Sequence, residues 1–320
     1  MTPNEVGNSI ALKKRFCKDN NVPISLFDTP YFDQRLNLIS QNSQGEKYCD
    51  KWLWFIKDLE AFETEQDYFT YYNSVKDSAI QTIKETEDFD KFIHDNSITY
   101  YLNDYGKRNL YVDQNDGKIF ISIDMNKANF TALNYYSSNI FGKAKTWEEF
   151  ISRFTDMKHI INSKYIRQVI LGTCNPKRQI KFEEYLTVKM ANILKYSGNI
   201  FPTIYSVGFD EIIIEVPKDC GYSFNDILQL KNAYPVGELY RAELFELHKL
   251  PNGYGWYKTY YKCEDWSKLY AGVEFKCVPS EIYNQVLKHW LGVPINKDDL
   301  VFYHNGQLAQ FLEPIQNPWE

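Results

Sequence analysis

The chain has 320 residues and a net charge of −6, with 44% hydrophobic and 24% charged residues. A chain of this length buries roughly three quarters of its unfolded surface, so it needs no disulfide or metal to fold. The composition excludes global disorder, and no apolar run approaches the roughly 20 residues of a membrane span. We expect no signal peptide and no membrane partner. The widely spaced cysteines are interpreted as reduced thiols, which favours a cytoplasmic protein.

Residues 1–95 are predicted to be mainly helical. Apolar side chains recur at spacings of three and four, as on one buried helix face, at Trp52, Phe55, Ile56, Leu59 and Phe62. By the same test, residues 79–87 predict a short helix. The first 45 residues are polar with weak periodicity, and we expect them to be partly mobile.

From about residue 97 the pattern changes to alternation, which predicts strands. Residues 118–123 alternate after the turn signal Asp116-Gly117 and predict a central strand that ends at Asp124. Residues 203–207 and 212–216 predict a hairpin whose tip carries Asp210 and Glu211. The fold class predicted from this order is α+β, with helices on one face of an antiparallel sheet.

Further helices and strands are predicted around and after these strands. Thr146 is expected to cap a helix over residues 146–154, with Glu149 at the capping-box position. Helical patterns cover residues 182–198 and 280–291. Residues 238–250 and 254–261 predict two strands, or a strand and a helix.

One segment concentrates positive charge in an otherwise acidic chain. Residues 157–182 contain no acidic residue, and they hold Lys158, Lys164, Arg167, Lys177, Arg178 and Lys181. Such a segment predicts a phosphate-binding site. The alternative is a solvated helix face whose charges pair with neighbours.

Asp124 and the pair Asp210–Glu211 are the candidate catalytic residues. If their strands are neighbours in one sheet, the carboxylates converge at its edge and repel each other unless a cation lies between them. A pair of Mg²⁺ (or Mn²⁺) ions held in this way can clamp the attacking and leaving oxygens of a phosphoryl transfer. The alternative is that hairpin tips are acidic because they are exposed to water.

The order of a strand aspartate, a basic helix and an acidic hairpin resembles the palm domain of nucleic-acid polymerases. Residues 123–130, 167–178 and 206–211 occupy these three positions. Residues 237–243 and 275–279 are faintly similar to the end of family B DNA polymerases, and Asp210-Glu211 resembles the acidic turn of tRNA-His guanylyltransferases and diguanylate cyclases. The hairpin reads Val-Gly-Phe-Asp-Glu, where family B polymerases and reverse transcriptases have other signatures.

The resemblance implies a role for each of these residues. Asp124, Asp210 and Glu211 would hold the metals. A nucleoside triphosphate would contact Arg167, Lys177, Arg178, Asn129 and Phe130. Nucleic acid would contact Lys164, Lys181 and Lys276. For Phe130, which could stack under the sugar, a core position is the alternative.

The resemblance also implies a domain division and a function. It suggests a helical region over 1–95, a palm-like core over 96–217 and a thumb-like subdomain over 218–320. The predicted function is metal-dependent nucleotidyl transfer by a viral or mobile-element protein, located in the host cytoplasm if viral. The alternative is a non-catalytic phage or viral protein that binds nucleic acid or a protein partner, with a degenerate palm or an unrelated fold. A nuclease and a small-molecule cyclase are weaker alternatives. The chain lacks the glycine-rich motifs of P-loop and dinucleotide-binding folds and the nucleophile elbow of hydrolases.

Overall fold

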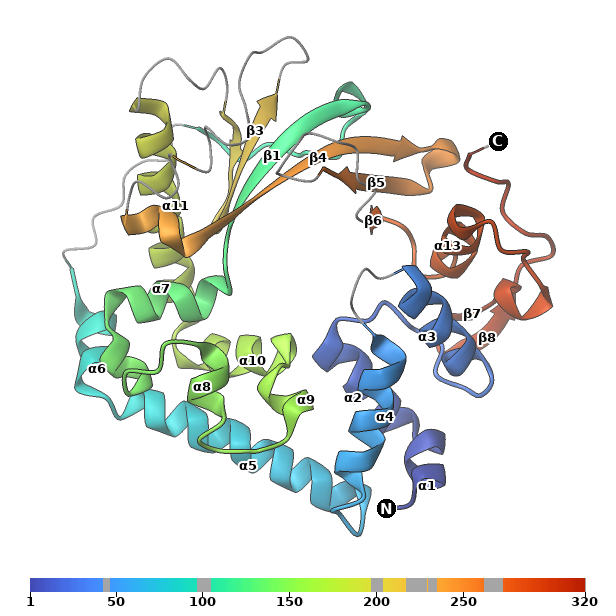
Figure 1. Ribbon diagram of the computed structural model, residues 1–320, viewed down its shortest axis with the longest axis horizontal. Helices are drawn as coiled ribbons and strands as arrows, with labels where there is room; N and C mark the ends of the chain where they lie inside the picture. The colour runs from blue at the N-terminus through green and yellow to red at the C-terminus, as the bar shows by residue number, and fades with distance from the viewer. Residues whose placement is uncertain are drawn as a thin grey trace.

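A computed structural model describes residues 1–42, 47–96, 105–196, 204–216, 229, 235–261 and 273–319. Its fold is α+β, with a six-stranded antiparallel sheet, a helical N-terminal region and a small C-terminal sheet, as predicted. Figure 1 shows the large sheet at the top of the molecule and the long helix α5 along the bottom. No helix among the described residues is long and apolar enough to cross a membrane.

The helices before the sheet are α1 (Pro3–Asn8), α2 (Ile10–Asn20), α3 (Tyr31–Asn42), α4 (Tyr48–Leu59), α5 (Glu65–Lys84) and α6 (Glu87–His94). Those that follow β1 are α7 (Ala128–Tyr136), α8 (Trp147–Ile151), α9 (Lys158–Ile161), α10 (Lys164–Cys174), α11 (Pro176–Tyr196) and α13 (Tyr283–Leu291). The strands are β1 (Lys118–Met125), β2 (Ile204–Val207), β3 (Glu211–Val216), β4 (Tyr240–Leu250), β5 (Gly255–Tyr260), β6 (Val273–Lys276), β7 (Val301–His304) and β8 (Gln307–Gln310).

The large sheet has the strand order β2-β3-β1-β4-β5-β6, and every neighbouring pair is antiparallel. The strands β1, β2 and β3 precede residue 217 and β4, β5 and β6 follow it, yet all six belong to one sheet. The predicted domain boundary at residue 217 therefore separates strands that pair with each other, β1 and β4. Residue 217 itself and Thr203, the predicted start of the hairpin, lie outside the described residues.

The alternation of β1 separates two apolar layers. Ile121 and Ile123 point into the large core, where α7 and α11 pack, while Phe120 packs with Phe245 in a smaller cluster on the other face. Because side chains alternate along a strand, Asp124 continues the row of Phe120 and is not part of the isoleucine row. In Figure 1 the helix α7 lies below the sheet and α11 stands to its left.

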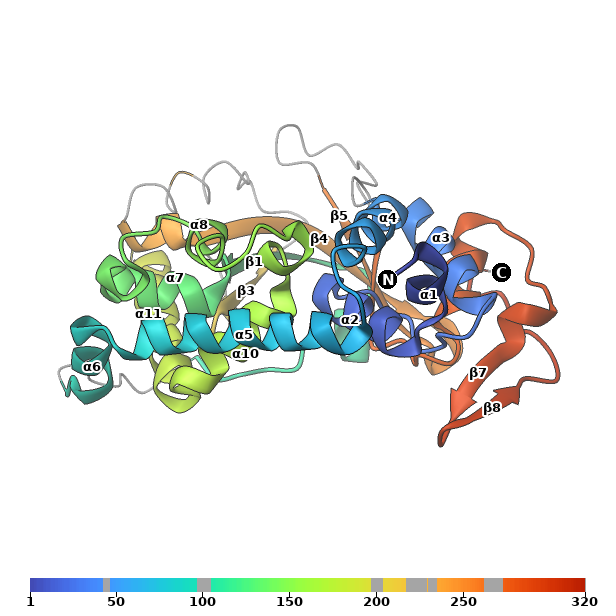
Figure 2. The same cartoon turned by 90° about the horizontal axis from the view of Figure 1, so that it is seen from below.

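The N-terminal region differs in detail from its prediction. Its first 42 residues, part of the segment expected to be partly mobile, form three helices with buried apolar side chains such as Phe16 and Phe32, and residues 43–45 lie outside the described residues. The predicted short helix over 79–87 is the end of the 20-residue α5 and the start of α6. The buried face of α5 includes Tyr68 and Tyr72 beside Val75, Ala79 and Ile83, so its spacing is less plainly apolar than that of residues 52–62. Figure 2, the view from below, shows this helix running across the molecule from α6 towards α2, and α10 packs against it.

Candidate active site

Strand pairing brings Asp124 and Asp210 together. In the β1–β3 register Asp124 lies opposite Glu211, and the Met125 amide donates a hydrogen bond to the Asp210 carbonyl at 2.8 Å. The turn between β2 and β3 closes with the Gly208 amide donating to the Glu211 carbonyl at 2.7 Å. The end of β1 and the hairpin tip therefore form one edge, and both aspartates line a cavity of about 1030 Å³ there. We call this the acidic-edge cavity.

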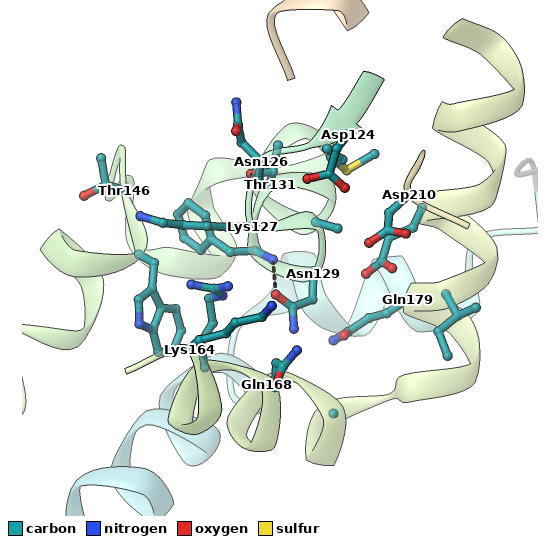
Figure 3. A pocket seen from close by; sticks show the side chains of 18 of the residues that line it. Asp124, Asn126, Lys127, Asn129, Thr131, Thr146, Lys164, Gln168, Gln179 and Asp210 are labelled. Atoms are coloured by element: carbon teal, nitrogen blue, oxygen red, sulfur yellow. Dashed lines mark hydrogen bonds between the residues drawn. The ribbon is translucent and has the colours of Figure 1, made fainter. Parts of the chain in front are cut away.

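The negative charge of Asp210 affects the protonation of Asp124. Burial raises the pKa of Asp124 to about 6, opposed by Arg241, while the carboxylates of Asp210 and Glu211 raise it further. A cation placed between the two aspartates would relieve this repulsion. Figure 3 shows Asp124 and Asp210 facing the same space, opposite Asn129 and Gln179.

Helix α10 supplies the cationic wall of the cavity. The Ser163 hydroxyl caps its start by accepting a hydrogen bond from the Ile166 amide at 3.0 Å. Lys164, Arg167 and Gln168 follow at spacings of three and four, which place side chains on one helix face, and all three line the cavity. Lys164 and Gln168 are exposed, whereas Arg167 is 8% exposed.

Three buried nitrogen donors of the lining have no hydrogen-bond partner among the described residues. They are Arg167 Nε, Gln179 Nε2 and Trp147 Nε1, in residues that are at most 8% exposed. A buried donor without an acceptor is costly, and native proteins commonly satisfy such donors with ordered water or a small side-chain movement. Their shared chemistry is N–H donation, which suits the oxygens of an anionic ligand.

Two further lining residues were not predicted from the sequence. Glu183 of α11 lies one turn after Gln179, and burial and the Asp210 charge raise its pKa to about 7. Arg241 of β4 binds Asp124 directly. The four-residue spacing of Gln179 and Glu183 was a signal for a shared helix face, but the position of Arg241 depends on the strand register, which the sequence does not reveal.

Several predicted residues lie elsewhere. Glu211 is absent from the lining, and its carboxylate accepts a hydrogen bond from the Ser122 hydroxyl at 2.6 Å. Arg178 stacks on Phe92 and donates hydrogen bonds to the carbonyls of Phe92 and Asp95. Lys177 and Lys181 are exposed on α11 outside the lining, and Lys276 forms an ion pair with Glu274 at 2.6 Å.

Asn129 and Phe130, from the first turn of α7, both line the cavity. The Asn129 side chain accepts a hydrogen bond from the Phe130 amide at 3.1 Å. Phe130 is only 4% exposed, and its ring lies 4.6 Å from that of Phe141. Its ring therefore belongs mainly to the core, with an edge at the cavity.

The lining of the acidic-edge cavity determines which ligands a divalent metal would find there. Among the described residues, no group of three or more His, Cys, Asp or Glu is placed to hold an ion. Of the carboxylates in the lining, Asp124 and Asp210 meet where the end of β1 joins the hairpin tip, and these two would hold such an ion. Two carboxylates offer only oxygen ligands, and few of them. This suits Mg²⁺, which commonly binds through one or two carboxylates and completes its coordination with water and substrate phosphates.

Comparison with known proteins gave no relative from which a function could be transferred. No protein-family model matches the chain, and neither the curated proteins nor the solved structures gave a significant match.

Proposed function

We propose that the chain catalyses metal-dependent nucleotidyl transfer from a nucleoside triphosphate at the acidic-edge cavity. One observation carries the proposal: a single cavity is lined both by the carboxylates of Asp124 and Asp210 and by the cations Lys164 and Arg167. This combination suits a ligand that has phosphate oxygens along its length and needs a divalent cation at one point.

Each residue would have a defined task. Asp124 and Asp210 would hold Mg²⁺, which supplies charge neutralisation at the transferred phosphate. Arg167 and Lys164 would bind the phosphate oxygens, with Gln179 donating a further hydrogen bond. The oxygen of an acceptor hydroxyl attacks the α-phosphorus, the bond to the β-phosphate breaks, pyrophosphate leaves, and the hydroxyl proton passes to water. The contribution of the protein is mainly positioning and electrostatic stabilisation.

The experiment compares Asp124→Asn and Asp210→Asn with the wild type in the incorporation of labelled nucleotides into a primed polynucleotide with Mg²⁺. We expect activity to fall at least about 10³-fold in both variants, because each removes a metal ligand. Asp156→Asn, at an exposed residue outside the lining, is the matched control and should retain activity. Circular dichroism checks that the variants fold. Full activity in either cavity variant contradicts the proposal.

One observation favours the non-catalytic alternative, in which the chain binds nucleic acid or a protein partner without turnover. Arg241 already neutralises Asp124 with hydrogen bonds from its guanidinium. In that case ligand binding would be stoichiometric and independent of divalent metal, and no pyrophosphate would be released. Measuring pyrophosphate release in the same reactions separates the two functions.

A further inference from the structure

A second cavity adjoins the acidic-edge cavity across the first turns of α10. It has a volume of about 1020 Å³ and lies between the N-terminal helices, α10 and strands β5–β6. Lys164 and Gln168 line both cavities, so the two spaces meet at these residues. In Figure 1 the elements around it, α2, α3 and β6, lie to the right of α10. We call this second space the basic groove.

The charged side chains of the basic groove are mostly positive. They comprise Lys14 and Lys18 on α2, Lys164 on α10, and Lys276 and Glu274 on β6. Glu274 is paired with Lys276 at 2.6 Å, so the other three lysines remain as an excess of positive charge. In a protein with a net charge of −6, such a local excess points to an anionic ligand.

Aromatic rings accompany the lysines. The lining includes Phe27, Tyr48, Tyr165, Tyr260, Phe275 and Tyr283. Lys14 Nζ lies 5.7 Å from the ring centre of Phe27, and Lys18 Nζ lies 5.7 Å from that of Tyr165. Lysines interleaved with aromatic rings suit single-stranded nucleic acid, whose phosphates need cations and whose unpaired bases need flat surfaces for stacking.

We propose that the basic groove binds a single-stranded segment of nucleic acid and leads it to the acidic-edge cavity past Lys164 and Gln168. The assignment of this segment to the substrate of the transfer reaction rests on the proposed function, whereas its binding does not. The helix α2 is remote in sequence from the strands that carry the aspartates, yet it supplies two of the groove's lysines. The contacts use phosphates and base faces, which DNA and RNA share.

The test measures the dissociation constants of fluorescein-labelled 16-nucleotide oligo(dT) and oligo(U) by fluorescence anisotropy on the full chain, in EDTA and at several salt concentrations. The double variant Lys14→Glu/Lys18→Glu should raise both dissociation constants at least about tenfold. Loss of two phosphate contacts should also lower the slope of log affinity against log salt by about 1.4, since each contact with a single strand contributes about 0.7. Lys14→Gln/Lys18→Gln should give a smaller change in the same direction, and it guards against a folding defect caused by charge reversal.

The matched control is Lys57→Glu/Lys189→Glu, which makes the same charge change at exposed lysines outside both cavities. It should leave affinity within about twofold of the wild type if the groove, and not overall charge, governs binding. The proposal is overturned if the wild type binds neither oligonucleotide, if the Lys14/Lys18 variants bind as the wild type does, or if the control weakens binding equally.

The two proposals can fail separately. Asp124→Asn should retain oligonucleotide binding in EDTA while losing incorporation. If incorporation depends on Asp124 but oligonucleotide binding does not depend on Lys14 and Lys18, the groove assignment fails alone. If binding depends on these lysines but no nucleotide is incorporated with Mg²⁺ or Mn²⁺, the nucleotidyl-transfer proposal fails and the groove remains a nucleic-acid site.

Discussion

Arg241 lies directly opposite Asp124 in the β1–β4 register, and its guanidinium binds one oxygen of that carboxylate through Nε at 3.1 Å and Nη2 at 3.0 Å. Arg241 is the more exposed partner, with a side chain that is 55% exposed against 26% for Asp124. The guanidinium therefore supplies the positive charge that offsets the Asp124 carboxylate, which a bound divalent cation would also do.

Replacing Arg241 by methionine should increase the affinity for Mn²⁺, because the cation would no longer displace a bound guanidinium. The gain should be about two- to fivefold, since exposed ion pairs contribute roughly 1 kcal/mol or less. Isothermal titration calorimetry of Mn²⁺ binding measures it. Lys145→Met removes an exposed positive charge from the same cavity lining, so it controls for the general field. Equal affinities in Arg241→Met and the wild type would contradict the prediction.

Glu183 should make the protein less stable as the pH rises from about 4.5 to about 7. Burial raises its pKa in the folded protein to about 7, so the unfolded chain loses this proton first on raising the pH. Above pH 7 Glu183 is ionised in both the folded and the unfolded chain, and the full free-energy cost of burying its charge is present. Glu183→Gln should therefore raise the free energy of unfolding at pH 8 by about 1–3 kcal/mol and leave it unchanged below pH 4.5.

Urea denaturation at pH 4 and pH 8 measures this difference between Glu183→Gln and the wild type. Glu184→Gln alters the neighbouring residue of α11, which lies outside the lining of the acidic-edge cavity, and serves as the control. A stabilisation of equal size at both pH values would show that the variant acts through packing and not through the ionised carboxylate.

The edge that joins Asp124 to Asp210 could be predicted from the sequence because its signals are local. The alternation at 118–123, the turn before it and the short apolar runs on either side of residue 210 each specify a strand or a turn. Two antiparallel strands that pair over their full length must bring the end of one to the tip of the other. The closeness of Asp124 and Asp210 in Figure 3 therefore follows once β1 and β3 pair, whereas the pairing itself was a condition of the prediction.

The rest of the site depends on contacts between distant segments, which local patterns do not encode. Arg241 reaches Asp124 only through the β1–β4 register, and Glu211 binds Ser122 because the two side chains lie on adjacent strands of the same sheet. Arg178 donates hydrogen bonds to the backbone carbonyls of Phe92 on α6 and of Asp95, although its charge alone suggested that it binds phosphate. The positive segment thus divides into cavity residues and residues with structural contacts.

The ion pair between Arg15 and Asp19 should be important for stability. Asp19 is 1% exposed and pairs with Arg15 at 3.1 Å, and it accepts hydrogen bonds from the hydroxyls of Tyr72 and Ser163. These contacts join α2 to α5 and to the start of α10. Arg15→Met leaves a buried carboxylate without its cation and should lower the free energy of unfolding by about 3–5 kcal/mol.

Urea denaturation of Arg15→Met measures this loss, and Arg15→Met/Asp19→Asn should recover part of it, because the double variant has no uncompensated charge. The control is Lys91→Met, which breaks an exposed pair with Glu87 on α6 and should leave stability unchanged within error. If Arg15→Met proved as mild as Lys91→Met, Asp19 would have to be neutral in the folded protein.

Phe130 should act as a packing residue of α7 and not as a selector of the nucleotide sugar. It is 4% exposed, and its ring lies 4.6 Å from that of Phe141 and 6.2 Å from that of Trp147. Phe130→Leu should therefore lower the free energy of unfolding by about 1–3 kcal/mol, because it opens a small cavity in the core. Tyr135→Leu, at a position on the same helix that is 41% exposed, should change it by less than about 0.5 kcal/mol. The ratio of deoxyribonucleotide to ribonucleotide incorporation should be the same in Phe130→Leu as in the wild type. A variant that keeps its stability but gains ribonucleotide incorporation would instead place the Phe130 ring against the sugar.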